Sequence, residues 1–208
     1  MQLTLSGTML RRTALLLVGC LVLGVGVALL LVADLGSDGF STLVNGLAIA
    51  SGLPFFVCNV VVSGAFLLLA AFRRVIPGIG TLVQILVVGA TVSVVIELFG
   101  TPESLPSRIG LVVLAMPVLA VGIAAYLGAN LGAGPIEAAG LAWDPPLPFR
   151  WSYSAVQLLG ALGGWLLGGT VGLTTIFVIA LLGPMVDAAS RMLHLDVHQG
   201  PAHREPVR

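Results

Sequence analysis

Six long apolar runs limit what this chain can fold into more than any other feature of its sequence. An apolar helix of roughly 20 residues crosses the ~30 Å hydrocarbon core of a bilayer. The runs cover residues 12–33, 54–72, 78–99, 109–129, 151–169 and 171–191. Hydrophobic residues make up 58% of the 208 residues and charged residues 9%, whereas a soluble domain carries roughly 25% charged residues. We therefore predict an all-α membrane protein with six transmembrane helices.

Two shorter segments, 34–53 and 130–150, lie between the first and second runs and between the fourth and fifth. Each begins with a glycine-rich turn and continues as a short helical pattern, at residues 40–50 and 136–143. Neither pattern is long enough to cross a bilayer comfortably. We expect each of them to form a short re-entrant or interfacial helix.

The two short segments belong to a sequence repeat. Ala33-Asp34-Leu35-Gly36 recurs 96 positions later as Ala129-Asn130-Leu131-Gly132, and Gly78-Ile79-Gly80-Thr81 recurs 94 positions later as Gly172-Leu173-Thr174-Thr175. Six crossings give three to each copy, and an odd number makes the second copy enter the membrane from the opposite side. We predict two inverted three-helix repeats, residues 12–99 and 109–193, joined by an outer loop at 100–108.

The arginines orient this arrangement. All nine positively charged side chains are arginines, and positive residues collect in cytoplasmic loops near the ends of membrane helices. With six crossings and a cytoplasmic start, only Arg108 lies outside. With eight crossings, Arg73 and Arg74 would lie outside instead. Six crossings therefore fit better, with a cytoplasmic N-terminus at 1–11 and a disordered cytoplasmic tail at 194–208.

Acidic residues in the short segments are the first candidates for function, because an ionisable group in a membrane is costly and marks a candidate site. Asp34 and Asp38 precede the first short helix, and Glu137 opens the second. Gly134-Pro135-Ile136-Glu137 has the pattern of a helix start. This pattern is equally compatible with a purely structural cap and with backbone N–H groups that bind an anion. Asp34 is equally compatible with a solvated carboxylate at the outer boundary.

We expect the two helix starts to meet and bind a small anionic or zwitterionic solute. Uncharged polar residues would line the same space, above all the repeat partners Thr81 and Thr175. The candidate solute-binding residues are Asp34, Gly36, Asp38, Ser41, Thr81, Asn130, Gly134, Glu137, Gln157 and Thr175. Glycines at intervals of four, such as Gly160, Gly164 and Gly168, predict close packing of helices in lipid instead.

Enzyme and cofactor signatures are not evident. No histidine falls in an apolar run, and the chain has no P-loop, Gly-x-Ser-x-Gly or His-Glu-x-x-His motif. We predict no enzyme, no catalytic residue, no metal and no cofactor. Cys20 and Cys58 are expected to be buried apolar residues. The formal net charge of zero gives no electrostatic reason to expect nucleic acid as a partner.

The repeat motifs resemble the YczE-like family of bacterial integral membrane proteins and, more distantly, the YitT group. The resemblance covers about residues 12–190, and its most specific part is the stretch 163–172, Gly-Gly-Trp-Leu-Leu-Gly-Gly-Thr-Val-Gly. Ala33-Asp34-Leu35-Gly36, Asn130-Leu131-Gly132-Ala133-Gly134-Pro135 and Gly78-Ile79-Gly80-Thr81 also carry it. The resemblance implies a multi-pass protein of the bacterial plasma membrane and implies little about its activity.

The chain departs from this family at positions that carry charge. Members commonly have Pro-Trp-Asp where this chain has Gly39-Phe40-Ser41, and Gly-Pro-Arg-Asp where it has Gly134-Pro135-Ile136-Glu137. A common Asp is Ser93 here, and a common Arg and Glu are Tyr153 and Gln157. The carboxylate thus remains at Glu137 but not at Ser41 or Ser93. This argues against paired intramembrane acids and proton coupling, and favours a neutral-lined pore or a different substrate.

Three functions remain open. The first is a small secondary transporter or exporter that binds a solute between the repeats and rocks one repeat against the other. The second is an accessory membrane protein that packs against an enzyme or export complex, because glycine stripes suit helix partners. As partners, a homo-oligomer or another membrane protein also stays open. The third, an intramembrane enzyme using Asp34, Glu137 or Asp187, has the least support. The expected partners are the bilayer and an unidentified small solute.

Overall fold

The computed structural model describes residues 2–143, 146–147 and 149–195. Every regular element in these ranges is a helix, which confirms the predicted all-α class. The helices are α1 (Gln2–Ala33), α2 (Gly39–Ser51), α3 (Phe55–Phe72), α4 (Ile79–Leu98), α5 (Leu105–Gly128), α6 (Pro135–Leu141), α7 (Phe149–Leu166) and α8 (Leu173–Met192). Most of the expected tail, 194–208, lies outside the described residues.

Five of the six predicted runs form helices that are long and apolar enough to cross a membrane: α1, α3, α4, α5 and α8. The fifth run forms α7, which is not among them. Polar residues such as Ser152, Tyr153 and Gln157 lower its mean hydropathy. Both short helices are present as predicted, as α2 and α6. Helix α5 begins at Leu105, four residues before the expected 109, because Ser104 caps it and Pro106 favours its first turn.

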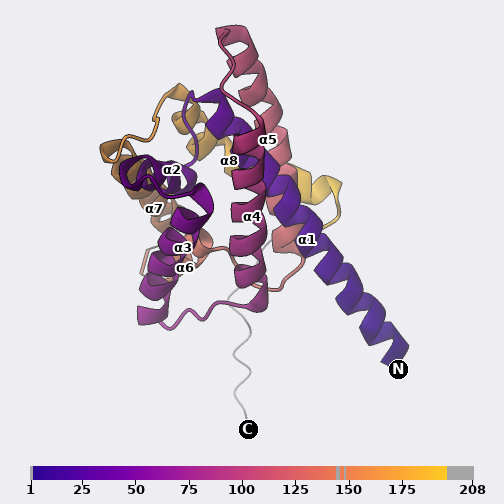
Figure 1. The fold of residues 1–208 in the computed structure, drawn as a ribbon. Coiled ribbons are helices and arrows are strands. Elements are labelled where there is room, and N and C mark those ends of the chain that lie inside the picture. The colour runs from indigo at the N-terminus through magenta and orange to yellow at the C-terminus, as the bar shows by residue number, and fades with distance from the viewer. Residues whose placement is uncertain (1, 144–145, 148, 196–208) are drawn as a thin grey trace.

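The helices form two groups, and each group takes helices from both halves of the sequence. Helix α1 packs against α4 and α5, and α5 packs against α8. Helix α2 packs against α3 and α7, and α6 packs against α3 and α7. We call α1, α4, α5 and α8 the first group, and α2, α3, α6 and α7 the second group (Figure 1). The groups meet mainly where α3 contacts α4.

Contacts between the two halves come in matched pairs at the spacing of the sequence repeat. In the first group, α1 and α5 run in opposite directions (Figure 1). A Cβ atom added at Gly26 would lie 2.8 Å from Cγ of Leu119, and one added at Gly122 would lie 2.7 Å from Cα of Leu23. Both positions are 96 residues from their counterparts. The absence of side chains at the two glycines therefore lets α1 and α5 approach closely.

Helices α2 and α7 are held together by glycines of the predicted stripe. A Cβ atom at Gly160 would lie 2.7 Å from the carbonyl oxygen of Gly39, and one at Gly164 would collide with the carbonyl group of Thr42. Gly168 instead follows the end of α7 with a left-handed φ of +97°. Small residues at intervals of four therefore serve close helix packing at two of the three positions.

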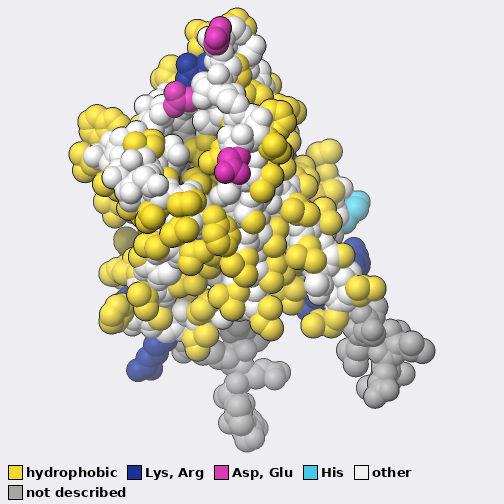
Figure 2. Space-filling model, viewed as in Figure 1, with side chains coloured by type: hydrophobic (Ala, Val, Ile, Leu, Met, Phe, Trp, Pro, Cys, Tyr) yellow, Lys and Arg dark blue, Asp and Glu magenta, His cyan; other side chains and the backbone are white. Residues whose placement is uncertain are grey.

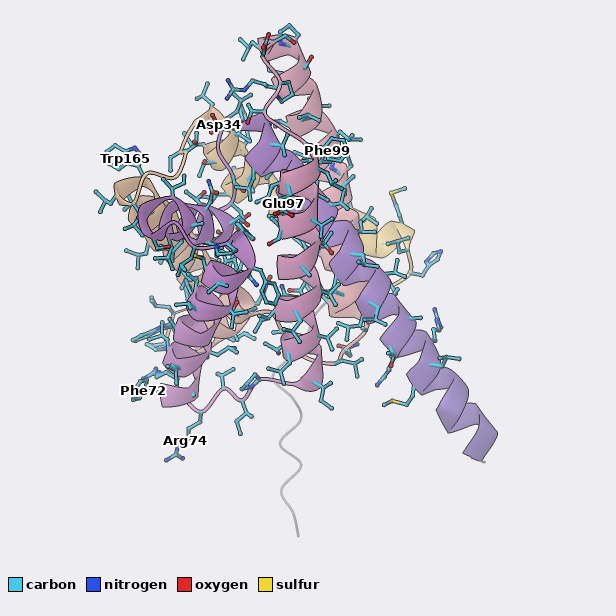
Figure 3. The ribbon with its side chains drawn as sticks, in the orientation of Figure 1. Asp34, Phe72, Arg74, Glu97, Phe99 and Trp165 are labelled. Carbon is cyan, nitrogen blue, oxygen red and sulfur yellow. The ribbon has the colours of Figure 1, made fainter. Side chains whose placement is uncertain are left out.

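The outer surface is largely apolar, as a membrane protein requires. Figure 2 shows apolar side chains over most of the viewed face, and the exposed ones include Leu68, Leu82, Val113 and Leu181. Charged residues lie towards both ends of the molecule (Figure 3). Asp34 and Phe99 lie towards one end of the molecule, and Phe72 and Arg74 lie at the other (Figure 3). The long helices connect these two ends.

Candidate functional site

A cavity lies where the two helix groups meet, and all eight helices contribute to its wall. Its volume is about 60 Å³. A buried water needs roughly 10–15 Å³ on this measure, so the cavity has room for a few waters or one small solute. Four of the ten candidate site residues line it: Asp38, Ser41, Glu137 and Gln157.

The two groups give the cavity two different walls. The first group contributes almost only apolar side chains, such as Leu23, Val88 and Leu119. The second group, with the N-cap residue Asp38 of α2, contributes acidic, hydroxyl, amide and aromatic side chains; these are Asp38, Phe40, Ser41, Phe55, Asn59, Glu137, Tyr153 and Gln157. The first group adds one amide, Gln84. A solute in this cavity would have one polar and one apolar neighbourhood.

Glu137 stands out because its charge is not matched by a partner. Its Oε2 atom is buried, and no described residue forms a hydrogen bond with it. The side chain is nevertheless partly exposed, since it lines the cavity. Gly134 makes room for it: a Cβ atom at that position would collide with Oε2 and would lie 2.8 Å from Nε2 of Gln84. A buried carboxyl oxygen without a hydrogen-bond donor is costly. A ligand that donates a hydrogen bond to this oxygen would remove that cost.

Both tyrosines of the chain lie beside Glu137, although sequence reasoning did not select them. Tyr126 on α5 is fully buried, and its hydroxyl approaches the Glu137 carboxyl without a hydrogen bond of standard geometry. Tyr153 on α7 accepts a 3.0 Å hydrogen bond from Nε2 of Gln157 and interacts electrostatically with Glu137 and Asp38. The available signal was that the sequence has only two tyrosines. Both lie near helix ends, where tyrosines also serve as interfacial anchors.

The start of α2 is already occupied by protein groups. Oδ1 of Asp38 accepts a hydrogen bond of 3.0 Å from the Ser41 amide, and Oε1 of Gln157 accepts one of 2.7 Å from the Gly39 amide. Capping residues satisfy first-turn amides in this way. The first-turn N–H groups at Gly39 and Ser41 are therefore not free to bind an anion, contrary to the expectation from the sequence. The structure instead brings two carboxylates, Asp38 and Glu137, to one cavity.

Thr81 and Thr175 form hydrogen bonds with backbone groups in the connections between helices, and they do not line the cavity. Thr81 donates to the carbonyl oxygen of Ala133 at 2.6 Å and accepts from the Gly78 amide at 3.2 Å. Thr175 accepts from the Gly172 amide at 3.4 Å. A Cβ atom at Gly132 would lie 2.9 Å from Oγ1 of Thr81.

The same arrangement recurs in the other half of the repeat. A Cβ atom at Gly36 would lie 2.8 Å from the Gly172 nitrogen, and both Gly36 and Gly132 have left-handed φ angles, +109° and +139°. Asn130, the repeat partner of Asp34, is exposed and has a φ of 52°. Of these four candidate positions, Gly36 and Asn130 thus belong to the turns, and Thr81 and Thr175 belong to the first turns of the helices that follow them.

Asp34 lies apart from the cavity and joins three parts of the chain. Its carboxylate forms an ion pair with Arg108 at 3.3 Å and accepts a hydrogen bond from Thr170. Arg108 also donates to the carbonyl oxygens of Ala33, at 2.6 Å, and of Asp34. These contacts connect the end of α1, the start of α5 and the turn before α8. We call Asp34, Arg108 and Thr170 the latch.

Within the described ranges, no group of three or more His, Cys, Asp or Glu side chains is placed to hold a metal ion. Cys20 and Cys58 are free and fully buried, as predicted. Glu97, on α4, and Asp187, on α8, do not line the cavity.

Comparison with known proteins gives a family. Residues 10–191 match the model of DUF6198, described as a family of unknown function. The chain belongs to this family. An uncharacterized protein of Haemophilus influenzae is 29% identical to this DUF6198 protein over 179 residues, which cover 85% of this chain and 82% of the relative. No solved structure matches. The description of DUF6198 names no activity, so the cavity is the basis for assigning a function.

Proposed function

We propose that this DUF6198 protein is a small membrane carrier that binds a solute in the cavity between its two helix groups. One observation carries the proposal: Glu137 lines a cavity to which every helix contributes, and its carboxyl group has a buried oxygen without a partner among the described residues. A protein with a purely structural role gains nothing from such a group, because a buried unpartnered polar atom costs stability. Solute sites of transporters lie between repeats at interrupted helices.

The proposed membrane arrangement has six crossings, with α7 as the sixth crossing helix and α2 and α6 as short re-entrant helices. Trp165, in the last turn of α7, lies towards the same end of the molecule as Asp34 and Phe99 (Figure 3). Arg74 lies at the opposite end (Figure 3), which we assign to the cytoplasm by the positive-inside rule. The resemblance to the YczE-like family supports a multi-pass protein of the plasma membrane.

The moving parts in this proposal are the two helix groups and not the two sequence repeats. Each repeat contributes helices to both groups, and α1 and α5, from different repeats, pack tightly through Gly26 and Gly122. Four connections pass between the groups, and they lie together in pairs: 34–38 beside Gly172, and 129–134 beside Gly78. We assign these paired turns as the hinges around which the second group moves, opening the cavity to each side in turn.

Cysteine reactivity tests this carrier proposal without a known solute. Ser41 and Ser63 are both buried, at 4% and 1% exposure, but only Ser41 lines the cavity. We expect Ser41→Cys to react with membrane-impermeant thiosulfonates from either side of the membrane. Ser63→Cys and the wild-type protein, whose two cysteines are buried, should stay unreactive. A cationic and an anionic reagent are used in parallel, so that the charge of the reagent does not decide the outcome.

Two results would overturn the proposal. Protection of Ser41→Cys from both sides, in protein that is folded by size-exclusion chromatography, would favour the accessory role. Reaction from one side alone would show a pocket that opens to one compartment, which is incompatible with alternating access.

A further inference from the structure

We infer that the cavity binds a small organic cation whose N–H groups donate to the Glu137 carboxylate. This inference rests on the proposed function, since the carrier supplies the route by which a solute reaches the cavity, and it names the class of that solute. It replaces the anionic or zwitterionic solute that the two helix starts predict from the sequence.

The charge of the cavity is the first argument. Its described lining contains two carboxylates, Asp38 and Glu137, and no arginine or histidine. Two arginines have partners away from the cavity: Arg108 pairs with Asp34, and Arg73 contacts the carbonyl oxygen of Ala142 and the ring of Trp143. Two close carboxylates in a low-dielectric space repel each other and attract a cation.

The bonding capacity of Glu137 is the second argument. Its Oε2 atom is buried and accepts nothing from the described protein groups. Hydrogen bonds from a cationic N–H group to a carboxylate are short and roughly twice as strong as neutral ones. A guanidinium or ammonium ion would satisfy this oxygen, whereas an anion would add a third negative charge beside the two carboxylates.

The remaining walls favour an organic ion over a metal ion. Phe40, Phe55 and Tyr153 supply aromatic surface, and the first group supplies aliphatic surface. Aromatic faces attract organic cations, while Ca²⁺ requires six to eight oxygen ligands and Mg²⁺ about six. The part of the chain that the structure describes has no cluster of three metal-ligating acidic, His or Cys side chains. The volume of about 60 Å³ restricts the solute to a few non-hydrogen atoms in this conformation.

Three probes of matched size test the charge of the ligand: methylguanidinium, methylurea and propionate. Each carries methyl or methylene protons, so binding to the full chain in lipid nanodiscs is measured by saturation-transfer NMR. We expect methylguanidinium to bind and the neutral and anionic probes to bind at least about tenfold more weakly. Glu137→Gln should weaken methylguanidinium binding about tenfold or more, the loss expected for a charged hydrogen bond. The control Glu103→Gln removes an exposed carboxylate away from the cavity and should change nothing.

Each outcome decides the inference. Equal binding of propionate or methylurea, or methylguanidinium binding that survives Glu137→Gln, would overturn it. If Glu137→Gln does not fold, competition on the wild-type protein decides: guanidinium should displace methylguanidinium, and urea should not. Reaction of Ser41→Cys from both sides without cation binding would leave the carrier standing and refute the cation. Glu137-dependent cation binding with an unreactive Ser41→Cys would support the cation site and refute the carrier.

Discussion

The backbone amide of Gly39 donates a buried hydrogen bond of 2.7 Å to Oε1 of Gln157, which lies 118 positions later in the chain. This bond joins the start of α2 to α7, and Gln157 also lines the cavity. The first amides of a helix have no partner within the helix, so a side chain from the other repeat completes α2. The polar wall of the cavity therefore depends on contact between the repeats.

Replacing Gln157 by Met should destabilise the protein by about 1–3 kcal/mol, because it leaves the buried Gly39 amide without an acceptor. The side chains are similar in length, so loss of packing contributes little. The midpoint of thermal unfolding in detergent, followed by size-exclusion chromatography, measures the change. Gln84→Met is the matched control, since the structure gives Gln84 no such bond to a helix start. Equal losses in the two variants would contradict the role assigned to Gln157.

Gly132→Ala should cost about 1–2 kcal/mol or more, because position 132 has a φ of +139° that L-residues rarely adopt and its Cβ would lie 2.9 Å from Oγ1 of Thr81. Gly64→Ala places the same methyl group where nothing lies within 4 Å, in the middle of α3. That control should be neutral or stabilising by up to about 1 kcal/mol, because alanine has the higher helix propensity. Thermal unfolding of both variants checks the prediction, and an unaffected Gly132→Ala would contradict the tight turn.

Cysteine labelling at three positions tests whether α7 crosses the membrane. With six crossings, Arg74→Cys and His194→Cys lie on the same side, and Thr101→Cys lies on the opposite side. If α7 did not cross, His194→Cys would lie on the same side as Thr101→Cys. Labelling with an impermeant maleimide in right-side-out and inverted vesicles separates the two arrangements. Eight crossings would also place Arg74→Cys and His194→Cys on different sides.

Breaking the latch with Arg108→Gln should have a small effect on stability and a larger one on opening. The ion pair with Asp34 is partly exposed, with side-chain exposures of 23% and 48%, and such pairs contribute less than about 1 kcal/mol. A shift of about 1 kcal/mol changes the ratio of two states roughly fivefold. We therefore expect Ser41→Cys to react up to about fivefold faster from the Asp34 side, with its rate from the other side unchanged or lower. Equal acceleration from both sides would show that the substitution loosens the whole structure, and would contradict a side-specific role of the latch.

Much of the fold was predictable because it follows from local patterns. The apolar runs predicted the long helices, and the Gly-Pro start predicted α6 at Pro135. The glycine spacing predicted close packing, which Gly160 and Gly164 form against α2. The run 151–169 was expected to cross the membrane, but α7 is not among the helices long and apolar enough to do so. Two of its polar residues form hydrogen bonds with protein partners: Ser152 bonds to Gly140, and Gln157 to Gly39.

The candidate site was only partly predictable. Asp38, Ser41, Glu137 and Gln157 were selected from the sequence and do line one cavity. Thr81 and Thr175 were selected because they are repeat partners. Both form hydrogen bonds at the starts of their helices and do not line the cavity. Tyr126 was missed because a tyrosine near a helix end has the same local pattern as an interfacial anchor.

The sequence alone determined that this chain is helical, that it is built for an apolar solvent, and that its two halves share landmarks, since these properties are carried by composition and by spacing along the chain. Only the tertiary structure decided which helices pack together, that the start of α2 is capped by a residue from the other half, and that Asp38 and Glu137 share one cavity. The physical reason is that hydropathy and helix periodicity depend on neighbours in sequence, whereas hydrogen-bond partners and charge surroundings depend on residues about a hundred positions away, as in the Gly39–Gln157 bond across 118 positions.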